Sequence, residues 1–397
     1  MKRILLLLFF VGICCFSSCA KDKDIGKAPS TAPSYPDSYP SEVENYNYVL
    51  GTQTIGASYN FTDDTRLVET AKMIKQMGSN ILKTEIPLNG GHKYSHQVLE
   101  DDDSYKSIMQ MDFKYYFFWV YSSFKTSWTD GLSEKESIAE YENMFALADY
   151  LLKTFKGTGK EFYLGHWEGD WHLTDTNPDV YTVTAERIKG MIDWYSIRQK
   201  AVEDARAINK GSDVKVWHYC EVNRVFDALD KNYDRIVNKV LPDIDVDFVS
   251  YSSYDAINDK SYDALSKKLH KALNALEAAL KPKEGIQGKR VFIGEYGFSY
   301  KAVGQGDQNS RSVMVAKAAL EWGCPFCLYW EMYNNEIDQN GNQVGYWMIN
   351  SHGVKQQIYY THFNFYKEMK CWVYEYFVAN EKLPTTEEFT TKALQIL

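Results

Sequence analysis

Short apolar runs recur along the chain between residues 51 and 331, separated by longer segments with apolar positions on one helical face. Runs of four to eight mostly apolar residues between polar residues or Gly are typical of strands buried in a parallel sheet. We place eight such strands at residues 52–58, 80–86, 114–121, 161–167, 214–221, 247–254, 290–297 and 326–331.

The segments between these runs are predicted to be helices. Asp63 and Asp64 offer N-cap oxygens, Gly78 is a helix stop, and Ser133 with Glu136 has the spacing of a capping box. We expect helices at residues 64–78, 133–155, 184–209, 222–239, 262–280, 309–322 and 356–376.

The polar segment 87–103 lacks helical periodicity and is predicted to be a solvated loop. It contains His92 and His96, but a metal site needs a larger cluster of ligands than these two side chains provide. We therefore predict neither a metal nor a cofactor for this protein.

Eight strands alternating with helices match the count of a single-domain α/β fold, the (β/α)8 or TIM barrel. Strands joined by crossover helices must be parallel, and closure of the ring removes the exposed sheet edges. A doubly wound open sheet is the alternative, but no Gly-rich phosphate-binding turn follows the first strand. A chain of 397 residues is long enough for one large domain with a sizeable core.

Residues 1–18 have the pattern of an export signal. Two basic residues precede an apolar run, 4–13, that is too short to span a bilayer as a stable helix. The run leads to Phe16-Ser-Ser-Cys19, which resembles the lipobox of bacterial lipoproteins, where cleavage frees a Cys for acylation with fatty acids such as palmitate. We predict a lipoprotein anchored through Cys19 on the periplasmic or surface face of the bacterial cell envelope, at the outer membrane. Ordinary secretion after cleavage near Ala20 is the alternative.

The composition changes on either side of the predicted barrel. Residues 19–48, rich in Pro, Ser, Tyr and Asp, show no apolar periodicity and are predicted to be the anchor Cys and a disordered linker. We assign residues 49–380 to the barrel and residues 381–397 to a polar C-terminal tail.

The chain is acidic. Its formal net charge is −9, and loss of residues 1–18, which include Lys2 and Arg3, makes it −11. An acidic surface argues against nucleic acid or anionic lipid as the main ligand, so membrane contact is expected through the lipid anchor only. Aromatic residues form 15% of the chain, and flat rings stack on sugar faces as well as filling cores.

Four cysteines lie beyond the anchor, at Cys220, Cys324, Cys327 and Cys371. The CxxC spacing of residues 324–327 has no second pair at the distance of a zinc ribbon, which favours buried thiols. A disulfide involving Cys371 is the alternative in an oxidising compartment.

Acidic and aromatic residues lie at the ends of the predicted strands. Glu168 follows the fourth strand and Glu295 ends the seventh. Packing explains such positions poorly, because an unpaired buried carboxylate is costly, and sites in (β/α)8 barrels lie at these strand ends. A structural Glu paired with a Lys or Arg is the alternative. Such a face suits a neutral polyol, and two carboxyls across a glycosidic bond can cleave it by acid catalysis. The other candidate residues, proposed to bind substrate or to lie at these ends, are Glu85, Trp167, Asp170, Trp171, Glu221, Tyr251, Tyr254, Trp330, Glu331 and Asn334.

On these residues the chain resembles the clan A glycoside hydrolases, (β/α)8 enzymes with an acid/base Glu ending the fourth strand and a nucleophilic Glu ending the seventh. The run Phe292-Ile-Gly-Glu-Tyr-Gly297 is similar to their nucleophile strand, and Trp330 matches the Trp that ends their eighth strand. The resemblance implies a retaining glycosidase acting on an extracytoplasmic oligo- or polysaccharide, with Glu168 as acid/base, Glu295 as nucleophile, and Tyr254 or Tyr251 bonded to the nucleophile. A raised pKa is expected for Glu168 and an ionised state for Glu295.

One position departs from the clan's pattern. Trp167 stands where an Asn usually precedes the acid/base Glu, which is compatible with a changed subsite or with lost catalysis, and Glu221 is the reserve candidate for the acid. The alternatives are a non-catalytic carbohydrate-binding barrel and a barrel that serves a partner or a structural role. The sequence leaves open the sugar, the linkage, endo or exo action and the oligomeric state.

Overall fold

The computed structural model describes residues 36, 38–88 and 90–397. In this part of the chain eight parallel strands form one sheet in the order β1-β8-β7-β6-β5-β4-β3-β2. A bridge between Gln53 and Lys83 closes the ring, and the N–H of Thr54 donates to the carbonyl of Lys83 at 2.9 Å. The predicted (β/α)8 barrel is confirmed and the open sheet is excluded. The strands are β1 (Leu50–Thr52), β2 (Ile81–Ile86), β3 (Tyr115–Val120), β4 (Glu161–Gly165), β5 (Lys215–Val222), β6 (Phe248–Ser252), β7 (Val291–Tyr296) and β8 (Cys327–Tyr329).

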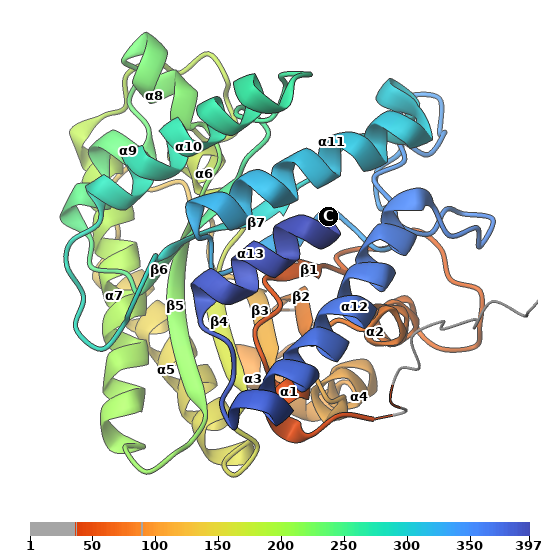
Figure 1. Cartoon of the computed structure of the whole chain (residues 1–397). Helices are drawn as coiled ribbons and strands as arrows, with labels where there is room; N and C mark the ends of the chain where they lie inside the picture. The colour runs from red at the N-terminus through yellow and green to blue at the C-terminus, as the bar shows by residue number, and fades with distance from the viewer. Residues whose placement is uncertain (1–35, 37, 89) are drawn as a thin grey trace, which may run out of the picture. The chain divides into compact units, whose positions relative to one another are not determined.

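Helices surround the strands (Figure 1). Ser133 and Glu136 form the predicted capping box at the start of α5, whereas Thr65 rather than Asp63 or Asp64 caps α2. The helices are α1 (Ser41–Glu44), α2 (Arg66–Met77), α3 (Ser95–Asp101), α4 (Asp103–Gln110), α5 (Glu134–Thr154), α6 (Gly169–Leu173), α7 (Ala185–Ile208), α8 (Val225–Lys231), α9 (Ile236–Lys239), the 3-10 helix η1 (Leu241–Asp243), α10 (Tyr262–Ala279), α11 (Tyr300–Trp322), α12 (Gln357–Asn380) and α13 (Thr386–Ile396).

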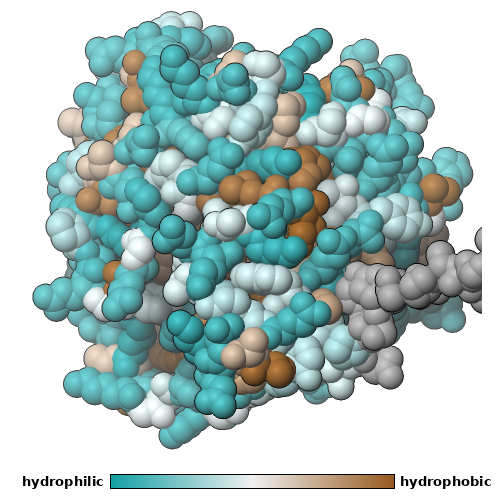
Figure 2. All heavy atoms as spheres, in the orientation of Figure 1, coloured by the Kyte–Doolittle hydropathy of each residue, from teal (hydrophilic) through white to brown (hydrophobic). Residues whose placement is uncertain are grey.

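The outer surface of the helices is mostly polar. Figure 2 shows a face that is largely hydrophilic, with hydrophobic side chains gathered in a strip near its middle. The apolar positions of the helices thus face the strands. None of the described helices has the length and apolar character required to cross a bilayer.

Aromatic rings fill the inside of the barrel. Because side chains alternate along a strand, Tyr115, Phe117 and Trp119 of β3 point inward, where Phe117 stacks on Tyr163 with ring centroids 4.4 Å apart. Phe326 adds an edge-on contact to Phe117 at 4.9 Å. The interior is therefore a packed core, and a binding site can form only above it, among the loops that follow the strands.

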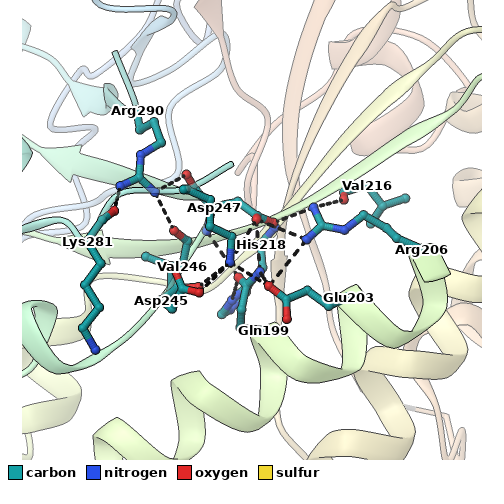
Figure 3. Close-up of polar contacts among 11 residues, drawn as sticks. Gln199, Glu203, Arg206, Val216, His218, Asp245, Val246, Asp247, Lys281 and Arg290 are labelled. Atoms are coloured by element: carbon teal, nitrogen blue, oxygen red, sulfur yellow. Dashed lines mark hydrogen bonds and ion pairs between the residues drawn. The ribbon is translucent and has the colours of Figure 1, made fainter. Parts of the chain in front are cut away.

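A network of charged and polar groups ties the opposite end of the barrel together (Figure 3). The buried carboxylate of Asp247, just before β6, accepts hydrogen bonds from Gln199 at 3.0 Å, Arg206 at 3.0 Å and the N–H of His218 at 2.9 Å. Arg290, just before β7, donates to the carbonyl of Val246 at 3.0 Å. These bonds connect α7 with the starts of β6 and β7 and with β5, so this end has a structural role.

The structure differs from the prediction in the segments that precede and follow the barrel in the sequence. The last part of the predicted linker 19–48 forms α1, and Val43 and Tyr48 are buried. The predicted tail 381–397 contains α13, in which Phe389 is buried and lies 5.3 Å from the ring of Tyr46. Each segment holds too few apolar residues to show periodicity, and the two bury their rings against each other. Residues 1–18 and Cys19 lie outside the described residues.

The predicted loop at residues 87–103 is also different, because its second half contains α3 and the start of α4. His92 lies 3.2 Å from Asp101, and His96 lies 3.8 Å from Glu100. No group of three or more His, Cys, Asp or Glu side chains in the described part of the chain is placed to hold a metal.

The four cysteines of the barrel are free thiols. Cys220, Cys324 and Cys327 are buried, as expected for core thiols, and Cys371 on α12 is partly exposed.

Candidate active site

A cavity of about 400 Å³ opens where the strands end. It brings together Glu168 from the segment after β4 and Glu295 from β7, which are 127 residues apart in the sequence. Three further predicted residues, Trp167, Tyr254 and Trp330, line it with them. The predicted residues thus meet on the face of the barrel at which (β/α)8 enzymes carry their sites.

Glu295 is held in the cavity by its strand and by one tyrosine. The side chain is only 5% exposed, and the hydroxyl of Tyr254 donates to its Oε1 at 2.8 Å, while Oε2 is buried and has no hydrogen-bond partner. Gly294 permits this placement, because a Cβ there would lie 1.8 Å from Oγ of Ser250 on β6. One oxygen of Glu295 is therefore fixed by the tyrosine, and the other is buried without a partner.

Glu168 lies on the turn between β4 and α6. Its N–H donates to Oε1 of Glu221 at 3.1 Å, and Nε1 of Trp171 donates to its Oε2 at 2.8 Å. The turn requires Gly169, since a Cβ there would lie 2.7 Å from the backbone oxygen of Glu221. The sequence Glu-Gly-Asp-Trp thus places the carboxyl and its indole donor together.

Both carboxyl groups have raised pKa values. Burial raises the pKa of Glu168 well above its usual range, and the charges of Glu295 and Glu221 raise it further. Burial also raises the pKa of Glu295, against the opposing effects of the ammonium group of Lys83 and the Tyr254 hydroxyl. The expected shift of Glu168 is present. The ionised state expected for Glu295 is not the one that burial favours, because burial raises the pKa of this carboxyl toward the protonated form and the tyrosine only partly opposes it.

Lys83 and Glu221 form a buried ion pair beneath the cavity. Nζ of Lys83 lies 3.2 Å from Oε2 of Glu221, donates to the carbonyl of Gly294 at 2.9 Å, and lies 4.6 Å from the ring centroid of Trp119. Glu221 also accepts from Oγ of Ser250 at 2.8 Å. Since its oxygens are engaged and it does not line the cavity, Glu221 is placed to position neighbouring groups rather than to donate a proton.

Four other candidate residues support the loops instead of lining the cavity. Tyr251 donates its hydroxyl to Asp255 and does not reach Glu295. Asp170 is buried and accepts the N–H of Ile236 at 2.8 Å. Glu331 accepts the N–H of Ile55 at 3.1 Å, and Asn334 donates to the carbonyl of Glu336 at 2.6 Å.

Sequence reasoning missed Lys83 and several residues of the cavity wall. A Lys at an inward position of an apolar strand was the available signal for Lys83, since such a charge needs a buried partner. Glu336 accepts from Nε1 of Trp330 at 3.1 Å, and its position only six residues after that Trp could have indicated it. The wall residues that were not predicted are Ile55, Tyr121, Glu336 and Tyr346, and Trp119 and Asn335 complete the wall.

Comparisons with known proteins bear on the fold. No protein-family profile and no curated protein sequence matches the chain. A family 5 lichenase from Caldicellulosiruptor, solved with cellotetraose, is 12% identical with a TM-score of 0.52, and the match covers 83% of this chain and 96% of that one. An endo-1,4-beta-xylanase from Penicillium canescens is 14% identical with a TM-score of 0.50, covering 83% and 98%.

A family 39 glycoside hydrolase from the gut symbiont Bacteroides cellulosilyticus is 12% identical with a TM-score of 0.49. The match covers 81% of this chain and 64% of that one, so the chain spans less than two thirds of that enzyme's length. At these identities the likenesses to the lichenase and the xylanase show a shared fold, and the fold of this chain is a (β/α)8 barrel.

Proposed function

We propose that the protein is a retaining glycoside hydrolase that cleaves an O-glycosidic bond of an oligo- or polysaccharide. The observation that carries this proposal is the placement of Glu168 and Glu295 in one cavity walled by aromatic rings. Each carboxyl has one oxygen held by a ring donor, Trp171 in one case and Tyr254 in the other. Two carboxyls that share a site with aromatic surfaces suit a sugar ring and the acid catalysis of its cleavage.

In the first step Oε2 of Glu295 attacks the anomeric carbon while the bond from that carbon to the leaving oxygen breaks. Glu168 gives its proton to the leaving oxygen, so the products are an alcohol and a glycosyl ester of Glu295. In the second step Glu168 takes a proton from water, whose oxygen attacks the same carbon and releases Glu295. The net reaction consumes one water and retains the anomeric configuration.

The charges around the cavity suit this division of roles. Lys83 pairs with Glu221, so Glu295 is left as the negative group that faces an oxocarbenium-like sugar. Because two interacting carboxyls cannot both ionise easily, the first proton lost leaves one acid beside one carboxylate. Lys83 and Tyr254 favour the ionised form at Glu295, and the competent form is therefore Glu168 protonated and Glu295 charged.

The sugar at the point of cleavage is expected to rest against Trp330. Trp167 lies on the cavity wall in place of the usual Asn, so it offers a ring face instead of an amide to the 2-hydroxyl. Asn335 lies nearby with its Nδ2 donating to the carbonyl of Ile55 at 2.9 Å, which leaves Oδ1 buried without a partner. This oxygen is available to accept a bond from a sugar hydroxyl.

The test is release of reducing ends from a panel of plant, host and microbial glycans. Glu295→Gln is the control, and its loss of turnover with retained sugar binding is the expected result. Proton NMR of the first product tests retention. Equal turnover in the control would remove Glu295 from the mechanism, and an inverted product would remove the two-step route.

A non-catalytic carbohydrate-binding barrel is the second candidate, and Trp167 is the residue that favours it. In that case the glycans bind the cavity and no reducing ends appear. We retain the proposal that the protein is exported and attached to the cell envelope through Cys19, which mass spectrometry of the purified native protein would test.

A further inference from the structure

A second cavity of about 240 Å³ lies beside the first, over the ends of β1 and β2. Ile55 lines the first cavity, and its chain neighbours Thr54 and Gly56 line the second. Tyr121 of the first cavity donates its hydroxyl at 2.9 Å to Oε2 of Glu85, which lines the second. The two cavities therefore lie at the same mouth of the barrel, and Ile55 and Tyr121 separate them.

The second cavity carries a cation that the fold does not need. Arg66 is exposed at the first position of α2, and within the described residues its guanidinium has no hydrogen-bond or ion-pair partner. A positive charge in the first turn opposes the helix dipole, so neither packing nor helix stability accounts for it. Glu85 lines the same cavity, together with Thr54, which follows β1, and Thr84 of β2.

We infer that this cavity is a second sugar subsite, which binds the unit next to the one cleaved. The inference rests on the proposed function of the first cavity. A forked guanidinium donor and a carboxylate acceptor can bind neighbouring hydroxyls of one sugar ring, which both donate and accept hydrogen bonds. The ring of Tyr121, which is 38% exposed, stands between the cavities and offers a surface that both units can contact.

A chain of sugars would thus cross the barrel mouth over β1 and β2. Hydrogen bonds to charged groups contribute about 1.5–3 kcal/mol, which corresponds to about a 10- to 150-fold gain in affinity. Affinity should therefore rise in one step, at the chain length that first reaches Arg66 and Glu85.

The experiment measures dissociation constants by tryptophan fluorescence for cello-, xylo- and manno-oligosaccharides of two to six units. Glu295→Gln serves as the parent so that no ligand is consumed. The parent should show a step of about tenfold or more at one length in a series that binds. Arg66→Met and Glu85→Gln, each added to the parent, should remove the step and leave the affinity of shorter chains unchanged.

Lys210→Met is the matched control, because Lys210 is an exposed cation after α7, at the opposite end of the barrel. This variant should keep the rise in affinity with chain length that the parent shows. The inference is overturned if no series binds, if affinity does not depend on length, or if Arg66→Met weakens the shortest chains as much as the longest. If the step is present but the wild-type protein releases no reducing ends, the catalytic proposal fails and the subsite stands.

Discussion

The hydroxyl of Tyr254 donates to Oε1 of Glu295 at 2.8 Å and leaves Oε2 of that carboxylate unpartnered inside the cavity. This contact joins the segment after β6 to the end of β7. It lowers the pKa of Glu295 against the opposing effect of burial, and it holds one of the two carboxylate oxygens in place.

Removing this hydroxyl should slow the first step. In Tyr254→Phe we expect kcat to fall about 10- to 150-fold, since a hydrogen bond to a charged group contributes about 1.5–3 kcal/mol. The acid limb of the kcat/KM profile should move to higher pH, because the pKa of Glu295 loses a lowering contact. Tyr251→Phe is the control, since that hydroxyl bonds Asp255 away from the cavity. Equal losses in both variants would contradict the assignment.

Loss of Lys83 should affect both stability and the pH profile. Lys83→Met leaves Glu221 buried without its cation, which we expect to cost about 3–5 kcal/mol of unfolding free energy. The double variant Lys83→Met/Glu221→Leu should recover most of that stability in denaturant titrations. The acid limb of the kcat/KM profile of the double variant should nevertheless differ from that of the wild type, because Lys83 and Glu221 both influence the pKa of Glu295. If the double variant is no more stable than Lys83→Met, the ion pair between Lys83 and Glu221 is not the cause of the lost stability.

The raised pKa of Glu295 predicts a cost in stability at neutral pH. A carboxyl whose pKa is higher in the folded than in the unfolded state binds protons more tightly when folded. The wild-type protein therefore loses stability as pH rises from the unfolded value of about 4.3 through the folded one. Glu295→Gln cannot ionise, so it should have a higher Tm at pH 7 and the same Tm near pH 4.

The control for this prediction is Glu388, whose pKa is lowered rather than raised in the folded protein. Hydrogen bonds from Tyr376 and from Thr385 hold the pKa of Glu388 to about 2. Glu388→Gln should therefore lower Tm at pH 7 and have little effect near pH 2. If Glu295→Gln also lowered Tm at pH 7, the burial of that carboxyl would not raise its pKa as described.

Among the residues that the structure describes, the cavity wall contains Glu168, Glu295 and Glu336 and no Lys, Arg or His, so it should reject acidic sugars. We expect 4-nitrophenyl β-glucoside to be preferred over the β-glucuronide in kcat/KM. Glu336→Lys should shift that ratio toward the glucuronide by about tenfold or more, since it reverses one nearby charge. Glu387→Lys on α13 makes the same charge change on the outer surface and should leave the ratio unchanged.

Much of the fold could be predicted because each strand is a short apolar run of its own. The predicted ranges 80–86 and 290–297 agree with β2 and β7 to within one residue at each end, since polar residues, Pro or Gly bound these strands. The segments around α1 and α13 were missed because their order depends on contacts between Tyr46, Tyr48 and Phe389, which are far apart in sequence.

The candidate site likewise combines residues that the local sequence reveals with residues whose position depends on the folded path of the chain. Glu295 lies in β7, and Glu168, Tyr254 and Trp330 lie within three residues of a strand end, so the ring of the barrel brings them together. Glu336 and Tyr346 lie on the long segment between β8 and α12, whose path depends on local turns that apolar periodicity does not reveal. Asp170 follows a strand as well, yet it turns away to hold backbone N–H groups, and the sequence alone does not separate these two outcomes.

The stacked rings inside the barrel, together with the polar network around Asp247 at its far end, have a consequence for how new specificities could arise. The network around Asp247 uses none of the loops that surround the cavity, whereas the stacked rings contact those loops at Ile55, Trp167, Trp330 and Tyr346. Away from these four residues the loops can therefore accept substitutions, insertions or grafted segments without loss of the scaffold beneath them. Directed evolution toward another glycan should begin in the segment between β8 and α12 and leave the inward faces of the strands untouched.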